Sequence, residues 1–123
     1  MSADLPNIIW VDCEMTGLDI QKDALVEIAV LVTDAQLNIL GEGVDLVIKC
    51  EQVKLDSMAE VVKNMHTNSG LIKEIPNGTS LEKADEAIIT YLKKYAPVEG
   101  KSPLAGNSVY VDRAFIARDL PLL

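Results

Sequence analysis

The stretch IIWVDCEMTGLDI, residues 8–20, begins as a buried strand and then places two acidic residues where its apolar run ends. Four apolar residues in succession are typical of a strand in the centre of a sheet. Asp12 and Glu14 follow them, two positions apart. Because side chains alternate along a strand, both carboxylates are expected on one face and Cys13 on the other. The sequence therefore predicts a core strand over 7–12 with paired acids at its exit.

Two further apolar segments predict a second strand over 24–34 and a third over 38–50. The link between them is short enough for a hairpin, so the first three strands are expected to form an antiparallel meander. Gly41 and Gly43 predict a bulge or tight bend in the third strand. A turn is predicted over 16–19, where the sequence reads TGLD.

The hydrophobic period then becomes helical, and a first helix is predicted within 55–71. Ser57 and Glu60 suit a capping box at its start. The apolar side chains at helical spacing are expected to face the core rather than to form a binding surface. They are Met58, Val61, Val62 and Met65.

A second and clearer helix is predicted within 79–97, with Thr79 and Glu82 as its capping box and Pro97 as its end. It carries one apolar stripe, which is also expected in the core. The stripe consists of Leu81, Ala84, Ile88, Tyr91, Leu92 and Tyr95.

A short strand over 102–106 and a last helix over 109–120 complete the pattern, with Ser108 as the N-cap of that helix. The order of three strands, helices, a strand and a helix predicts an α/β fold in which helices cover a sheet with an antiparallel portion. The 123 residues are enough for a single domain and not for two.

The composition favours a soluble, ordered protein of a reducing compartment, because 49% of the residues are hydrophobic, 24% are charged and only two are cysteines. Apolar runs stay shorter than the roughly 18 residues that a membrane span needs. The first residues, MSADLPN, resemble neither a secretory signal nor a mitochondrial leader. The expected location is therefore the cytoplasm, with no membrane partner.

The formal net charge of −8 has the wrong sign for a protein that binds a long phosphate backbone. It suits a protein that holds cations, or one that takes a very short anionic ligand in a local pocket. A solvated acidic surface without function is the alternative interpretation.

Paired carboxylates on one strand face repel each other and are costly to desolvate. A divalent cation would remove both costs at Asp12 and Glu14, and oxygen ligands favour hard ions such as Mg²⁺ or Mn²⁺. The alternative is that both acids are simply solvated at the end of the strand.

Asp112 is a third candidate, because it lies in the opening turns of the last helix, directly after a predicted strand. Strand-to-helix junctions line the crevice in which α/β proteins bind ligands. Asn107 and Ser108 stand at the same junction, where backbone N–H groups and hydroxyls suit a phosphate oxygen. The alternative is that Asp112 only complements the helix dipole.

Three segments, WVDCEMTGLD, HTNSGL and PLAGNSVYVDRAF, resemble the oligoribonuclease family in order and spacing, from about Ile8 to Leu120. That family belongs to the DEDDh group of 3′-to-5′ exonucleases, which have a ribonuclease-H-like fold. The resemblance implies this fold for the chain, with the meander joined by a parallel strand in one mixed sheet.

The resemblance further implies that Asp12, Glu14 and Asp112 are catalytic, as three of four acidic ligands of two Mg²⁺ or Mn²⁺ ions. Two such ions, roughly 3.5–4 Å apart, stabilise the attacking and leaving oxygens of a phosphoryl displacement. The implied substrates are single-stranded RNAs of two to a few nucleotides, degraded to mononucleotides, with short DNA as an alternative. The family also forms homodimers.

The resemblance also implies a substrate pocket. In it the backbone from Met15 through Thr16 to Gly17 meets the 3′-terminal sugar, Leu18 wedges against a base, His66 lines the pocket and Ser108 contacts a phosphate. For His66 the alternative interpretation is a half-exposed residue at the end of a helix.

Two departures from the family pattern bear on activity. Val61 stands where the family usually has a Trp that stacks on a base, an interaction that contributes ~1–3 kcal/mol per base. The third family motif, with a general-base His and the fourth metal-binding Asp, is not found in 1–123, so the match predicts an incomplete exonuclease domain that lacks the C-terminal part of the fold. An inactive module that binds short nucleotides or a full-length partner, and a poorly folding fragment, are therefore alternatives to an active enzyme.

Overall fold

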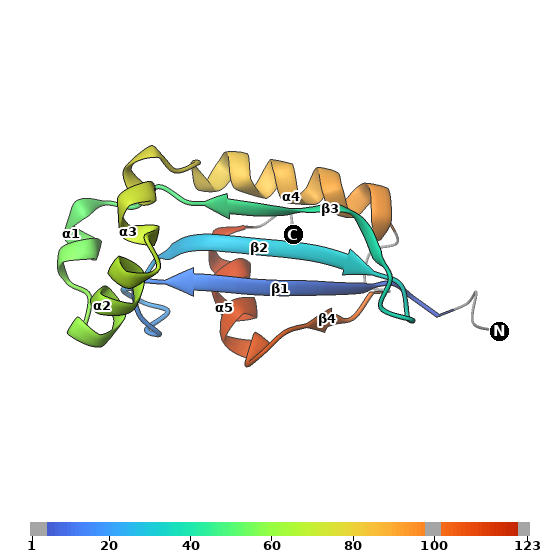
Figure 1. The fold of residues 1–123 in the computed structure, drawn as a ribbon, viewed down its shortest axis with the longest axis horizontal. Coiled ribbons are helices and arrows are strands. Elements are labelled where there is room, and N and C mark those ends of the chain that lie inside the picture. The colour runs from blue at the N-terminus through green and yellow to red at the C-terminus, as the bar shows by residue number, and fades with distance from the viewer. Residues whose placement is uncertain (1–4, 98–101, 121–123) are drawn as a thin grey trace.

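The computed structural model describes residues 5–97 and 102–120, which form one mixed four-stranded sheet with helices against it (Figure 1). The strands are β1 (Ile8–Met15), β2 (Leu25–Thr33), β3 (Ile39–Val47) and β4 (Leu104–Ala105), in the order β3-β2-β1-β4. The first three pair antiparallel and β4 pairs parallel to β1. The predicted meander and the α/β class are confirmed.

The first strand is longer than predicted. It continues to Met15, so Asp12 and Glu14 lie within the strand and not at its exit. Asp12 is paired with Ala29 and Glu14 with Glu27 of β2. The ladder persists because backbone pairing with β2 does not depend on which side chains occupy the outer face.

The glycines of the third strand produce the predicted irregularity. Gly41 and Gly43 have φ values of 71° and 74°, and the β2–β3 register shifts between Val30 and Val32. These left-handed conformations are accessible to glycine at little cost. The bulge prediction is therefore confirmed.

A helix is present within 55–71, as predicted, but it is shorter than that segment, and further short helices lie on either side of it. The segment folds as α1 (Gln52–Asp56), α2 (Glu60–Asn68) and α3 (Leu71–Glu74), followed by the 3₁₀ helix η2 (Ile75–Asn77). Ser57 ends α1, and its hydroxyl donates to the Val53 carbonyl at 2.8 Å, so it forms no capping box.

The core assignment of the 55–71 segment is half correct. Met58 is buried and Val62 packs beside it, in a small cluster that also contains Val26, Leu55, Leu71 and Ile75. Val61 and Met65 are instead 80% and 51% exposed. Val61, Val62 and Met65 all lie on α2, and this helix turns its half-buried Val62 and its buried His66 inward. Val61 and Met65 are four positions apart on its other side and therefore face solvent.

The long helix α4 (Leu81–Tyr95) ends before Pro97, as predicted. Its N-cap is Ser80, whose hydroxyl accepts from the Lys83 N–H at 3.2 Å. The Thr79–Glu82 capping box is therefore wrong by one residue. Thr79 instead continues the sheet edge, because its N–H donates to the Val47 carbonyl at 2.8 Å.

The last helix, α5 (Val109–Asp119), begins where the sequence predicts, after Ser108. Ser108 adopts a left-handed conformation with φ 51°, and its side chain makes no capping hydrogen bond. The capping position is thus confirmed and the capping contact is not found.

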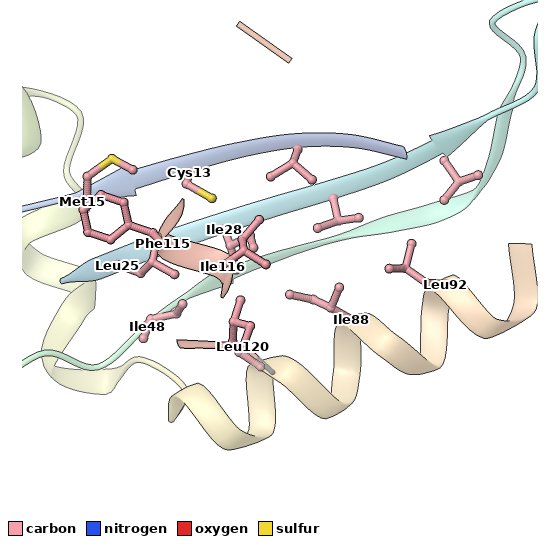
Figure 2. Packing of buried hydrophobic residues seen from close by; sticks show 14 residues of the cluster. Cys13, Met15, Leu25, Ile28, Ile48, Ile88, Leu92, Phe115, Ile116 and Leu120 are labelled. Carbon is pink, nitrogen blue, oxygen red and sulfur yellow. The ribbon is translucent and has the colours of Figure 1, made fainter. Parts of the chain in front are cut away.

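The main core lies between one face of the sheet and the helices α4 and α5 (Figure 2). Cys13 points into it, as the alternation predicts, and Cys13 and Cys50 are both free thiols. The α4 stripe contributes Ala84, Ile88 and Leu92, and α5 contributes Phe115, Ile116 and Leu120. None of the helices in the described residues is long and apolar enough to cross a membrane.

Candidate active site

Asp12 and Glu14 project from the face of β1 that is opposite to the core. Cys13, between them, is only 6% exposed and belongs to the core cluster, whereas Asp12 is exposed and Glu14 is half-buried. The prediction that the two carboxylates share one face is therefore confirmed.

Asp112 reaches the same segment of β1 from the other end of the chain. β4 pairs only with Ile9 and Trp10, so beyond Trp10 this edge of β1 is not paired with β4. There the Cys13 backbone N–H donates to Asp112 Oδ2 at 3.2 Å. The Asp112 carboxylate thus occupies the place of a strand partner, directly between the two acids of β1.

The three carboxylates repel one another. Burial raises the pKa of Asp112, and the charges of Asp12 and Glu14 raise it further, while the hydrogen bond from Cys13 acts in the opposite direction. Burial also raises the pKa of the Cys13 thiol, helped by the same three carboxylates. The ion pair found in 5–97 and 102–120 joins Arg118 to Asp119, so no salt bridge there neutralises the three acids.

These acids fit a divalent metal in kind, because carboxylate oxygens are the ligands that Mg²⁺ and Mn²⁺ prefer. No cationic side chain among the described residues forms an ion pair with them. The acids do not form a finished ligand cluster. Nowhere in the described residues do three His, Cys, Asp or Glu side chains converge closely enough to hold a metal ion. The fold gathers the three carboxylates along β1 without closing them around a common point.

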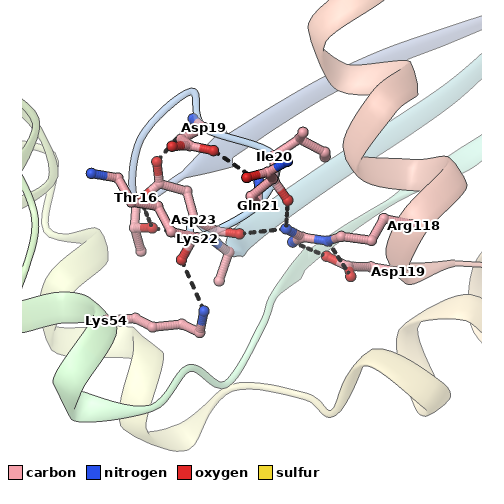
Figure 3. Close-up of polar contacts among 10 residues, drawn as sticks. Thr16, Asp19, Ile20, Gln21, Lys22, Asp23, Lys54, Arg118 and Asp119 are labelled. Atoms are coloured by element: carbon pink, nitrogen blue, oxygen red, sulfur yellow. Dashed lines mark hydrogen bonds and ion pairs between the residues drawn. The ribbon is translucent and has the colours of Figure 1, made fainter.

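The loop 16–24 follows β1. The chain bends at Thr16 and Leu18, but the hydrogen-bonded turn lies over 20–22, just after the predicted 16–19, where the Lys22 N–H donates to the Asp19 carbonyl at 3.2 Å. Thr16 Oγ1 donates to Asp23 Oδ1 at 2.9 Å and accepts from the Ala24 N–H at 3.0 Å. The Asp19 N–H donates to Asp23 Oδ2 at 2.9 Å (Figure 3). Inside this hydrogen-bonded loop Leu18 remains 75% exposed. A large apolar side chain is therefore presented to solvent on an ordered loop.

The backbones of Met15 and Thr16, which are predicted to meet the 3′-terminal sugar, already form hydrogen bonds within the protein. The Met15 carbonyl accepts from His66 Nε2 at 2.8 Å, and the Thr16 N–H donates to the Ala24 carbonyl at 2.9 Å. Both side chains are buried. Gly17 follows, next to the exposed Leu18.

His66 is buried and not half-exposed. It is 1% exposed, in the last turn of α2, and its Nε2–H donates to the Met15 carbonyl. Its Nδ1 has no hydrogen-bond partner among the residues described. The structure therefore gives His66 a place under the end of β1, while its contact with substrate stays a prediction.

A cleft of about 630 Å³ lies on the sheet face that α4 and α5 leave uncovered. Asp12 and Asn107 both line it, whereas Glu14 and Asp112 are not among its lining residues. Ser108, next to Asn107, is exposed at the same junction. The other lining residues include Trp10, Leu31, Glu42 and Asp45, which the sequence analysis did not select. The alternation on β1 could have identified Trp10, because it shares a face with Asp12.

A second acidic pair lies across the sheet from Glu14. Burial raises the pKa of Glu27 to about 7, aided by its hydrogen bond with Asp45 and by the charges of Asp45, Glu14 and Glu74. This pair has no counterpart in the sequence analysis, since it forms between β2 and β3 and depends on their register.

The sequence profile of the exonuclease family (RNase T) matches residues 9–123. Curated oligoribonucleases are similar to the chain: that of Cutibacterium acnes is 51% identical over 116 residues, and that of Streptomyces griseus is 52% identical over 113 residues. These matches cover 94% and 92% of the chain, but the chain spans only 57% and 56% of the two relatives.

Solved structures of exonuclease I have a similar fold. A product-bound structure superposes with a TM-score of 0.68 at 17% identity, over 94% of this chain and 26% of the other. Exonuclease I from Methylocaldum szegediense gives a TM-score of 0.62 at 21% identity, over 93% of this chain and 24% of the other. At such identities the likeness concerns the fold alone.

Proposed function

Because the chain belongs to the exonuclease family, among the oligoribonucleases, and has the expected ribonuclease-H-like fold, we propose that it acts on very short RNA as a 3′-to-5′ exoribonuclease. The observation that carries this proposal is the hydrogen bond from the Cys13 N–H to Asp112. It links residues that are 99 positions apart and gathers at one strand three carboxylates that have no salt-bridge partner among the described residues.

In this proposal Asp12, Glu14 and Asp112 hold two divalent ions, Mg²⁺ or Mn²⁺. When bound, such ions stabilise the attacking and leaving oxygens of a phosphodiester. The chain itself holds Asp112 in place through the Cys13 amide and keeps Asp12 accessible to solvent. Burial and the charges of Asp12 and Glu14 raise the pKa of Asp112, and a bound cation would offset both effects, which favours cation binding.

The substrate would be an RNA of two to a few nucleotides, with short DNA as an alternative. Leu18, exposed on its ordered loop, would pack against a base, and Asn107 with Ser108 would meet a phosphate beside Asp12. A net charge of −8 supports a short substrate, since a long polyanion would be repelled. A homodimer in the cytoplasm completes the proposal.

A hydrolysis assay on this chain tests the proposal. A 5′-labelled diribonucleotide is incubated with the protein in Mn²⁺, in Mg²⁺ and in excess chelator. The expected result is metal-dependent release of labelled mononucleotide that is lost in Asp12→Asn and retained in the control Glu86→Gln, an exposed residue on α4. Hydrolysis in chelator, or by the Asp12→Asn protein, would contradict the proposal.

A second candidate function is nucleotide binding without turnover. It is favoured by the lack of a converged metal cluster within 5–97 and 102–120. Titration calorimetry with the same diribonucleotide and Ca²⁺ in place of Mg²⁺ separates the two. Heat of binding without any hydrolysis in Mg²⁺ or Mn²⁺ would support the binding module.

A further inference from the structure

Arg118 joins helix α5 to the loop 16–24. Its Nη1 donates to the Ile20 carbonyl at 2.6 Å and to the Asp23 carbonyl at 2.7 Å (Figure 3). These contacts span more than 90 positions of sequence. One guanidinium nitrogen therefore holds two points of the loop that presents Leu18.

The guanidinium is itself held in place. Its Nε donates to Asp119 Oδ1 at 2.7 Å and its Nη2 donates to Asp119 Oδ2, which makes a two-pronged ion pair. Its Cζ also lies 4.9 Å from the centre of the Phe115 ring, which is buried in the core. A planar group fixed by a carboxylate and an aromatic face has little freedom, so the loop carbonyls meet a rigid donor.

The same helix carries Asp112 near its other end. Asp112 and Arg118 are six residues apart, about 9 Å along the helix axis. Asp112 contacts β1 between the two acids, and Arg118 contacts the loop that leaves β1. Helix α5 thus touches both the acidic segment and the loop with Leu18, each through a named polar contact.

We propose that Arg118 is a positioning residue that holds Leu18 at a set place relative to Asp12, Glu14 and Asp112. It does so through the backbone of the loop and without touching the RNA. This inference rests on the proposed function, because it gives Arg118 a part in binding the terminal nucleotide of a short RNA. A preorganised loop loses less conformational freedom on binding, so its anchor contributes to affinity.

A purely structural role makes a different prediction. If Arg118 only stabilised the fold, its replacement would lower the melting temperature and leave the affinity of the folded protein unchanged. If Arg118 positions Leu18, its replacement lowers the affinity for RNA by more than the loss of folding stability explains. This loss of affinity occurs only when Leu18 is present. A double-mutant cycle between Arg118 and Leu18 distinguishes the two.

The experiment measures binding of a fluorescently labelled diribonucleotide, with Ca²⁺ as the metal, to the full chain and its variants. Arg118→Gln is expected to raise Kd about tenfold. Arg118→Lys is expected to raise it less, because its ammonium group can still replace part of the contact with the two carbonyls. Leu18→Ala raises Kd as well, and adding Arg118→Gln to it has little further effect. The control Lys93→Gln, which removes one exposed positive charge from α4, leaves Kd unchanged.

Amide hydrogen exchange supplies a readout that does not need RNA. In Arg118→Gln the amides of Asp19, Asp23 and Ala24 are expected to exchange faster, while those of α4 keep their rates.

Unchanged exchange in the loop would overturn the positioning role even if RNA binds. Equal effects of Arg118→Gln with and without Leu18 would overturn it too. Failure of the unmodified chain to bind RNA would overturn both the proposed function and the role of Arg118 in affinity. The exchange rates would still show whether Arg118 holds the loop.

Discussion

The backbone N–H of Cys13 donates to the carboxylate of Asp112, so the residue between the two β1 acids is bonded to the third acid. This contact is possible because β4 leaves the edge of β1 after Trp10, where the first turn of α5 takes its place. Burial and the nearby charges of Asp12 and Glu14 then raise the pKa of Asp112.

Mn²⁺ should stabilise the protein through Asp112. Because a ligand that binds only the folded state raises the melting temperature, Mn²⁺ is expected to raise it in the unmodified chain. Asp112→Asn keeps an oxygen that accepts from Cys13 but removes a buried charge, so it should melt no lower without metal and gain little from Mn²⁺. Thermal melts with and without Mn²⁺ measure this, with Glu86→Gln as the control. An equal gain in Asp112→Asn would contradict the metal role of Asp112.

Glu27 should make stability fall as pH rises. Its pKa is raised from 4.5 to about 7 in the folded protein. The contribution of Glu27 to the free energy of unfolding is therefore complete below pH 4.5 and is lost as pH rises through about 7. Glu27→Gln mimics the protonated form and should be more stable than the unmodified chain at pH 8. Since Glu27 is partly exposed, the gain should stay well below the ~1.4 kcal/mol that one pKa unit represents. Urea unfolding from pH 5 to pH 8 would show it, and parallel curves for both proteins would refute it.

His66→Ala should destabilise the fold. The change leaves the buried Met15 carbonyl without its partner and opens a cavity under the end of β1, at a cost of roughly 2–4 kcal/mol. The neighbouring Met65→Ala is a matched control, because Met65 is 51% exposed and its truncation should cost less than about 1 kcal/mol. Urea unfolding at pH 7 measures both. Similar losses for the two variants would mean that the His66–Met15 contact contributes little.

Gly17→Ala should disturb the loop that presents Leu18. An added Cβ would lie 2.4 Å from Asp23 Oδ2, which is held by the Asp19 N–H, so that hydrogen bond must shift. Faster amide exchange at Asp19 is the expected result. In a protein that already carries Asp23→Ala, the same glycine change should have little further effect. Additive effects of the two changes would show that the crowding is not with Asp23.

Local patterns predicted much of the fold. The apolar run and the alternation around Cys13 identified a central strand with two acids on one face, and the short link after β2 identified the hairpin. The stripe on α4 identified its buried side. These features were predictable because side-chain direction follows from the period of the element alone.

Predictions failed where distant segments compete for the same residue. Thr79 suits a helix cap by sequence, but its backbone pairs with the end of β3, and Ser80 becomes the cap. For His66 it is the alternative interpretation, a half-exposed helix end, that the structure contradicts, because His66 is buried and hydrogen-bonded to the Met15 carbonyl. A side chain that can satisfy two roles is assigned by the partner that tertiary packing brings near, and a local pattern does not contain that partner.

The sequence by itself determined the sheet-forming segments, the shared face of Asp12 and Glu14, and, through its three motifs, the family. Only the tertiary structure decided that Asp112 bonds to Cys13 and that Arg118 holds the loop of Leu18. The physical reason is the range of the interactions: strand and helix periods arise from neighbours a few positions apart, whereas these hydrogen bonds join groups that meet only after β1 and α5 have packed against a common core.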